Sequence, residues 1–183
     1  MVNAAAIPAQ ELEERLKAHI RDVPDFPKPG IVFKDITTLL KDPGAMKMLV
    51  EQMALFFRDQ PIDYIVGIES RGFILGMPMA YILGCGFIPV RKPGKLPAAT
   101  HRREYALEYG TDSLEIHCDA LESGQRVVIV DDLLATGGTA SAAISLVQET
   151  GAEITAAIFA IELEFLNGRE KLSPCKTISL IKY

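Results

Sequence analysis

The chain has 183 residues, of which 49% are hydrophobic and 23% charged, and its formal net charge is −5 at pH 7. This length and composition are typical of one globular domain whose core needs no disulfides or metals. No apolar run reaches the ~20 residues needed to cross a bilayer, and acidic chains bind phosphate backbones poorly. We expect one domain over residues 1–183, with no membrane and no nucleic acid as partners.

The termini and cysteines carry no sign of export. The first residues lack a basic leader and a long apolar segment, so no secretory signal is predicted. Cys85, Cys118 and Cys175 lie far apart, without the paired spacing of a zinc site or a redox dithiol. We interpret them as reduced structural thiols and expect a cytoplasmic protein.

The first predicted element is a short amphipathic helix that ends before residue 24. Its apolar residues recur at helical spacing: Leu12, Leu16 and Ile20. The prolines of residues 24–30 exclude regular helix and predict an extended path into residues 31–33, which alone could form a plain edge strand. Residues 43–57 carry an apolar stripe behind Asp42, which predicts a capped helix packed on the core.

Short apolar strands then alternate with helices or turns. We predict strands at residues 64–68, 87–90, 127–131, 154–161 and 177–181. A helix over about residues 73–83 follows the first strand, and residues 91–113 read as irregular or hairpin-like, with two strands within 105–116. This order predicts an α/β fold with a parallel sheet and right-handed crossovers.

Residues 126–140 are the most informative segment. A β-branched run ends at Asp131 and Asp132, and ligands bind at the carboxyl ends of parallel strands. The Thr-Gly-Gly-Thr of residues 136–139 can turn tightly and present N–H groups at a helix start, which suits a phosphate monoester. The two acids suit ribose hydroxyls or a divalent cation. The segment therefore predicts a sugar-phosphate site.

Other phosphate motifs are absent, and a basic region stands out. The sequence contains no Gly-x4-Gly-Lys-Ser/Thr and no Gly-x-Gly-x-x-Gly after a strand, which removes the best support for a kinase or a dehydrogenase. Residues 91–95 and 101–103 hold six basic residues, counting a histidine, in an acidic chain. This patch suits a small polyanion, or it is a solvated loop.

Residues 126–140 resemble the phosphoribosyl pyrophosphate signature of the type I phosphoribosyltransferase family, in the form found in its adenine-specific members. Further matches follow the family's order at residues 24–27, 30–36, 70–73, 91–92, 94–97, 107–110 and 168–172. The resemblance implies a parallel-sheet fold with flanking helices, a small N-terminal hood over about residues 24–38 and a mobile lid loop over about residues 95–113.

The resemblance also implies the reaction. Adenine and 5-phosphoribosyl-1-pyrophosphate would give AMP and pyrophosphate, a purine-salvage step, in a homodimer. Mg²⁺ would be held by substrate oxygens and water, without dedicated protein ligands. The ribose 5-phosphate would be bound by Ala135, Thr136, Gly137, Gly138 and Thr139. Asp131 and Asp132 would face the ribose, or Asp132 would mainly orient the loop.

Pyrophosphate would be bound, by the same resemblance, at Ser70, Arg71, Arg91 and Lys95. The planar fork of Arg71 suits phosphate oxygens, although a surface arginine at a helix entrance is the simpler interpretation. In relatives the peptide before the serine is often cis. The arginine at the position of Arg91 serves its own or the neighbouring subunit.

Adenine would be read by Val32, Phe33 and Lys34. Backbone groups of the first and third contact the base in the family, and the aromatic ring stacks on it; Lys34 replaces the family's arginine. Glu108 matches the lid glutamate and is the candidate general acid, or it only positions the base. With Asp131 and Asp132 it completes the candidate catalytic set.

Two other functions compete with this interpretation. A transferase for hypoxanthine, guanine or xanthine would need side chains that address a 6-oxo group, and the hood and lid motifs argue against it. A ligand-sensing transcription regulator can share the fold without catalysis. Such regulators generally add a basic DNA-binding domain, and only about 20 residues precede the expected hood.

Overall fold

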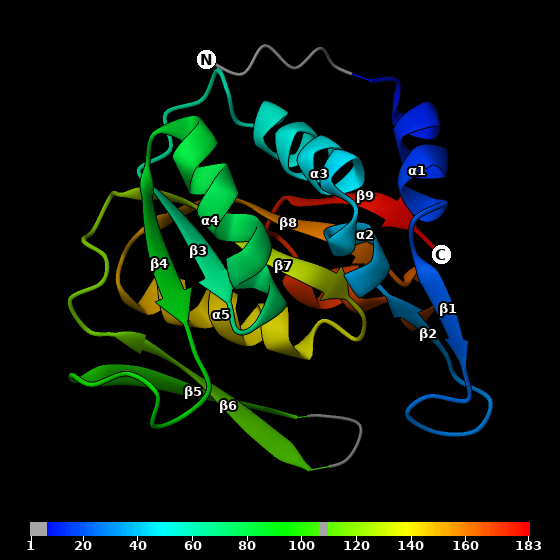
Figure 1. Ribbon diagram of the computed structural model, residues 1–183. Coiled ribbons are helices and arrows are strands. Elements are labelled where there is room, and N and C mark those ends of the chain that lie inside the picture. The colour runs from blue at the N-terminus through cyan, green and yellow to red at the C-terminus, as the bar shows by residue number, and fades with distance from the viewer. Residues whose placement is uncertain (1–6, 107–109) are drawn as a thin grey trace.

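A five-stranded parallel sheet forms the centre of the protein, seen in a computed structural model that describes residues 7–106 and 110–183 (Figure 1). Its strands are β3 (Tyr64–Ile68), β4 (Gly86–Val90), β7 (Arg126–Leu134), β8 (Glu153–Glu162) and β9 (Thr177–Lys182), in the order β4-β3-β7-β8-β9. All four neighbouring pairs are parallel. The expected α/β fold with a parallel sheet is confirmed.

Helices cover both faces of this sheet (Figure 1). The first face carries α1 (Ala9–Lys17), α2 (Thr37–Lys41), α3 (Pro43–Leu55) and α4 (Arg71–Leu83), and the second carries α5 (Gly138–Glu149). Side chains of β7 alternate between the two cores: Val128 and Val130 join the first, Val127 and Ile129 the second. A strand buried on both faces explains the continuous apolar run read from the sequence.

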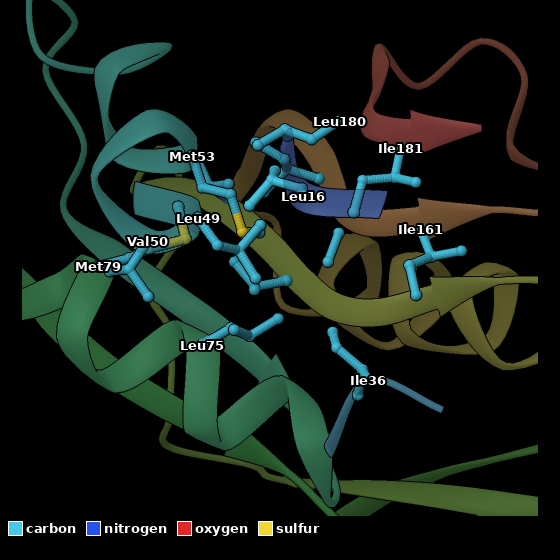
Figure 2. Packing of buried hydrophobic residues seen from close by; sticks show 14 of the residues in the cluster. Leu16, Ile36, Leu49, Val50, Met53, Leu75, Met79, Ile161, Leu180 and Ile181 are labelled. Atoms are coloured by element: carbon cyan, nitrogen blue, oxygen red, sulfur yellow. The ribbon is translucent and has the colours of Figure 1, made fainter. Parts of the chain in front are cut away.

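The first core is built from residues far apart in the sequence. Figure 2 shows side chains of α3 and α4 meeting those of α1, β8 and β9. They include Leu49, Met53, Leu75, Met79, Leu16, Ile161 and Ile181, all at most 1% exposed. The predicted cap is present: Asp42 accepts a hydrogen bond from the Ala45 N–H at 2.7 Å. The apolar stripe of residues 43–57 is therefore core, as expected.

Two small antiparallel sheets flank the centre. One pairs β1 (Arg21–Pro24) with β2 (Val32–Asp35), and the other is a hairpin that pairs β5 (Thr100–Ala106) with β6 (Thr111–His117). The hairpin is longer than the two strands expected within 105–116, because its ladder begins where Thr100 pairs with His117. Arg103 forms an ion pair with Glu149 of α5, which joins the hairpin to that helix.

The acidic pair lies inside β7 rather than after it, which corrects the predicted end of the strand at residue 131. Pairing with β8 continues past the acids, with Leu133 opposite Ile161 and Leu134 opposite Glu162. Two 3₁₀ helices, η1 (Glu164–Leu166) and η2 (Gly168–Leu172), connect β8 to β9. In the described part of the chain, none of the helices has the length and apolarity of a membrane span.

Candidate active site

A cavity of about 290 Å³ opens at the carboxyl ends of β3 and β7. The chain leaves β3 toward β4 on one side and leaves β7 toward β8 on the other, so this edge is the point where the strand order reverses. Open α/β sheets bind ligands at such a point. The wall includes both predicted segments, residues 70–71 and residues 131–132 with 135–139, which lie far apart in the sequence.

The loop of residues 135–139 passes directly into α5. Gly137 precedes the helix in the left-handed conformation, with φ 79°, and α5 begins at Gly138. A side chain at Gly137 would also collide with the carbonyl oxygen of Gly168 in η2. Only glycine fits this backbone, which brings the first N–H groups of a 12-residue helix to the cavity. Such a helix start attracts phosphate.

Asp131 and Asp132 line the same cavity beside this loop. Asp132 is 6% exposed and accepts a hydrogen bond from Arg71 Nε, and Oδ1 of Asp131 accepts one from the Asp132 N–H at 2.9 Å. Burial raises the pKa of Asp131 well above its usual range, and the adjacent charge of Asp132 raises it further, while Arg71 opposes both effects. This environment therefore favours the protonated form of Asp131 more than water does.

The first turn of α4 brings the second predicted segment against β7. Arg71 is its first residue and lies behind Ser70 at the N-cap. The following residue must be small, since a Cβ on Gly72 would stand 2.5 Å from the carbonyl oxygen of Val130. The Glu69–Ser70 peptide bond is cis, the form that the sequence resemblance includes.

Arg91 and Lys95 meet at a residue that the sequence analysis missed, Glu69. Its carboxylate accepts hydrogen bonds from Arg91 Nε and Nη2, both at 3.3 Å, from the Lys92 N–H at 3.0 Å and from Lys95 Nζ at 2.5 Å. Burial alone would raise the pKa of Glu69, but Lys95 and Arg91 lower it to about 2. Two predicted pyrophosphate residues are thus held by an internal anion.

Lys92 lines the cavity, whereas Arg91 and Lys95 do not. Its ammonium group donates to the Tyr105 hydroxyl at 2.9 Å and to the carboxylate of Asp112. The cavity is therefore joined to the hairpin β5–β6 through Lys92. Two sequence signals included Lys92: the family match at residues 91–92 and its place in the basic stretch of residues 91–95.

The residues predicted to read adenine, Val32, Phe33 and Lys34, do not line this cavity. Phe33 meets the ring of Phe26 edge-on at a centroid distance of 5.3 Å. Lys34 Nζ donates to Asp22 at 2.7 Å and lies 4.1 Å from the centre of the Tyr183 ring. Val32 is 50% exposed. Glu108, the candidate general acid, falls outside the described residues.

Asp131 and Asp132 could bind a cation only together with oxygen atoms of a ligand and of water. Among residues 7–106 and 110–183, no group of three or more histidine, cysteine or acidic side chains could hold a metal ion. Asp131 and Asp132 offer hard oxygen donors at the cavity. These donors fit Mg²⁺ when the ligand's own oxygens and water complete its shell.

Comparisons with known proteins agree with this geometry. Residues 37–171 match the family described as phosphoribosyl transferase domain, which defines the class of the protein. The adenine phosphoribosyltransferase of Acaryochloris marina is 58% identical over 92% of this chain and 99% of its own length. The crystal structure of that from Thermoanaerobacter pseudethanolicus superposes with a TM-score of 0.89 at 57% identity, over 93% of this chain and 99% of its own.

A third relative was solved with ligands. The Saccharomyces cerevisiae adenine phosphoribosyltransferase, complexed with an imino-altritol bisphosphate and adenine, superposes with a TM-score of 0.89 at 42% identity, over 93% of this chain and 99% of its own. This chain therefore belongs to the adenine phosphoribosyltransferases. The family and the enzyme class expected from the sequence, a pentosyltransferase, are confirmed.

Proposed function

We propose that this chain forms AMP and pyrophosphate from adenine and 5-phosphoribosyl-1-pyrophosphate, as a step of purine salvage. The observation that carries the proposal is one cavity that unites an acidic pair, a glycine loop at a helix start and Arg71. The 58% identity to an adenine phosphoribosyltransferase over nearly the whole chain supports adenine as the base. The yeast relative's complex with adenine and a sugar bisphosphate supports the same assignment.

The sugar phosphate is assigned to the β7–α5 side of the cavity. Residues 135–139 bind the 5-phosphate through loop and helix N–H groups. Asp131 and Asp132 accept hydrogen bonds from ribose hydroxyls. Because burial favours a proton on Asp131 in the free protein, binding that needs its ionised form is accompanied by proton release.

Pyrophosphate is assigned to Ser70 and Arg71, with Arg91 and Lys95 contributing from the adjacent segment. The side chain of Arg71 is 43% exposed, so part of its fork remains open to a ligand while Nε holds Asp132. Arg91 and Lys95 reach pyrophosphate by exchanging the carboxylate of Glu69 for ligand oxygens. Negative charge that develops on the leaving group is then neutralised by fixed cations.

Adenine is assigned to the hood and the lid. Backbone groups of Val32 and Lys34 read its edge, and Phe33 stacks on its face. Glu108 acts as general acid at N7 of adenine while N9 forms its bond to ribose C1 and the bond from C1 to pyrophosphate breaks. The N9 proton passes to the departing pyrophosphate or to water, and the N7 proton returns to Glu108. We assign the hood to residues 24–38 and the lid to residues 95–113 within one domain over residues 1–183. Closure of the lid excludes water, which would otherwise attack the sugar donor.

Mg²⁺ completes the proposed site. The bound ion supplies positive charge that neutralises the leaving pyrophosphate. Substrate oxygens and water would hold the ion, and Asp131 and Asp132 would supply negative charge at the cavity that favours its binding. No step requires a dedicated cage of protein ligands.

The proposed enzyme is a homodimer. Its proposed location is the cytoplasm, as expected from the sequence. The outer face of α4 carries exposed apolar side chains, with Ile74 44%, Met77 53% and Tyr81 88% exposed. Contiguous apolar surface of this kind suits a subunit interface. The oligomeric state in solution, measured by light scattering, tests this assignment: a monomer at micromolar concentration would contradict it.

The first experiment offers adenine, hypoxanthine, guanine and xanthine separately with 5-phosphoribosyl-1-pyrophosphate and Mg²⁺, and measures nucleotide formation. Each reaction has a metal-free control. Activity confined to adenine and Mg²⁺ is expected. Turnover of an oxo-purine would contradict the hood assignment while keeping the class of enzyme, and binding of the sugar donor without turnover would favour the regulator.

A further inference from the structure

The backbone of η2 lies directly behind the phosphate loop. A Cβ on Gly168 would collide with the carbonyl oxygen of Ala135, and a Cβ on Gly137 would collide with the carbonyl oxygen of Gly168. The two segments therefore touch main chain to main chain, without a side chain between them. Any displacement of Gly168 is transmitted to residues 135–139, the loop assigned to the 5-phosphate.

Arg169, the next residue, ties this segment to the sheet. Its Nε and Nη2 donate to the two oxygens of Glu162 at 2.9 and 2.5 Å, and its Nη1 donates to the carbonyl oxygen of Thr177 at 2.6 Å. Glu162 is the last residue of β8 and is 4% exposed, and Thr177 is the first residue of β9. One guanidinium thus joins the ends of two strands to η2.

The hydrogen bonds of Arg169 to Glu162 and Thr177, called the clasp below, depend on the shape of arginine as well as on its charge. A planar guanidinium can satisfy a carboxylate with two parallel hydrogen bonds and still reach a carbonyl with its third nitrogen. Lysine has a single nitrogen and cannot reproduce this geometry. The buried carboxylate of Glu162 would lose its charged partner if the guanidinium were removed, and a buried unpaired carboxylate is unfavourable.

We propose that Arg169 is a positioning residue for the phosphate loop: it holds η2 against the sheet so that Gly168 keeps residues 135–139 in the conformation that binds a sugar phosphate. The inference deepens the proposed function and rests on it. Arg169 does not line the cavity, and its guanidinium donates to Glu162, Thr177 and Ser179 rather than toward the phosphate loop.

The chain offers a matched control. Arg126 also forms a two-point pair with a carboxylate, donating from Nε and Nη2 to Asp63 at 3.1 Å each. This pair joins the start of β7 to the residue before β3, at the opposite end of the strands from the cavity. Arg169→Ala and Arg126→Ala each remove a two-point ion pair, although the carboxylate of Asp63 is more exposed than that of Glu162. Only the pair of Arg169 lies behind the phosphate loop.

The test compares steady-state kinetics and direct binding. We expect Arg169→Ala to raise the KM for 5-phosphoribosyl-1-pyrophosphate and the Kd for ribose 5-phosphate, measured by calorimetry, by roughly tenfold to a hundredfold. The KM for adenine should change less than about twofold, and Arg169→Lys should give an intermediate KM for the sugar donor. Arg126→Ala should leave all three constants unchanged.

Different outcomes separate this inference from the proposed function. A wild-type protein that makes no AMP would contradict the proposed function, whereas binding of ribose 5-phosphate would still test the clasp. An active wild type with an unchanged KM for the sugar donor in Arg169→Ala would overturn the inference, as would an equal rise in both KM values. If Arg169→Ala does not fold, Gly168→Ala and Arg169→Lys must each raise the KM for the sugar donor while the KM for adenine stays within about twofold, with the smaller rise in Arg169→Lys; an unchanged KM for the sugar donor in both would overturn the inference.

Discussion

Arg71 Nε donates a hydrogen bond to the carboxylate of Asp132 across the cavity, joining the start of α4 to β7. The Asp132 side chain is 8% exposed and that of Arg71 43% exposed, so the acid is enclosed while the guanidinium still faces solvent. In the absence of ligand, Asp132 therefore orients Arg71.

Replacement of both acids tests their role in ribose binding. The double variant Asp131→Asn, Asp132→Asn should lower turnover below roughly a hundredth of the wild-type rate, because the sugar loses two charged acceptors and Arg71 loses its partner. Circular dichroism should show an intact fold. Asp63→Asn, which alters an arginine-paired carboxylate at the far end of the sheet, is the control. Near-normal turnover in the double variant would remove ribose contact from the mechanism.

Asp131 should also limit stability at neutral pH. Its pKa is raised above the ordinary value of 3.8, so the folded state holds a proton that the unfolded chain releases, and stability is lost as pH rises above 3.8 toward the folded-state pKa. Asp131→Asn is expected to raise the free energy of unfolding at pH 8, because asparagine has no charge to bury. The gain should vanish near pH 3, and the exposed Asp119→Asn should show none. The measurement that checks this prediction is the free energy of unfolding in urea, determined for wild type and both variants at several pH values.

Glu69 should show the opposite dependence on pH. Its pKa is about 2 in the folded protein against an ordinary 4.5, so its contribution is complete above pH 4.5 and is lost as pH falls toward 2. Glu69→Gln should lower the free energy of unfolding at pH 7 by roughly 1–2 kcal/mol, allowing for solvent screening of Lys95 and Arg91. Glu104→Gln, in an exposed pair with Arg102, is the control. A gap between wild type and Glu69→Gln that persists at pH 2 would contradict the assignment.

Phe33 should affect the base and not the sugar. Phe33→Ala is expected to raise the KM for adenine roughly tenfold or more, since stacking of a base on an aromatic ring contributes about 1–3 kcal/mol. The KM for 5-phosphoribosyl-1-pyrophosphate should stay unchanged, because Phe33 is not part of the cavity wall. The control is Phe56→Ala, whose ring is 48% exposed and lies outside the hood. Equal changes in both KM values would indicate general disruption.

Glu108→Gln should slow the chemical step. A general acid contributes about 10²–10⁴-fold, so the single-turnover rate should fall at least about a hundredfold while adenine still binds. Glu104→Gln, on β5, should keep the wild-type rate. An unchanged rate in Glu108→Gln would rule out proton transfer by this residue.

Local patterns predicted the parallel fold because each strand, loop and helix unit carries its own signal. The β-branched run of β7 and the Asp42 cap of α3 are readable from neighbours in the sequence. The full length of β7 could not be read in this way, because Leu133 and Leu134 belong to the strand only through their pairing with β8. The hairpin was likewise predicted too short, because its ladder and its contact with α5 depend on tertiary pairing.

The candidate site was also predicted only in part from the sequence. The acidic pair and the loop of residues 135–139 come from one continuous motif and lie together in one wall. Glu69 was missed because its role depends on how residues 91–95 fold back onto it. The contact between Gly168 and the loop was missed because it involves backbone atoms alone, which no residue pattern encodes. Family resemblance pointed to residues 168–172 without saying what they touch.

The cavity lies across the boundary between β3 and β7, here called the seam. Arg71 lies on one side of this boundary and Asp132 on the other, and they are 61 residues apart in the chain. Neither half can hold a ligand in an unfolded chain, since the halves meet only after the two strands pair. A sugar donor bound across the seam acts as a clamp on the central strand pair and favours the folded state by mass action. Unfolding and proteolysis should therefore slow when substrate is abundant, so that the lifetime of the enzyme follows its supply of substrate.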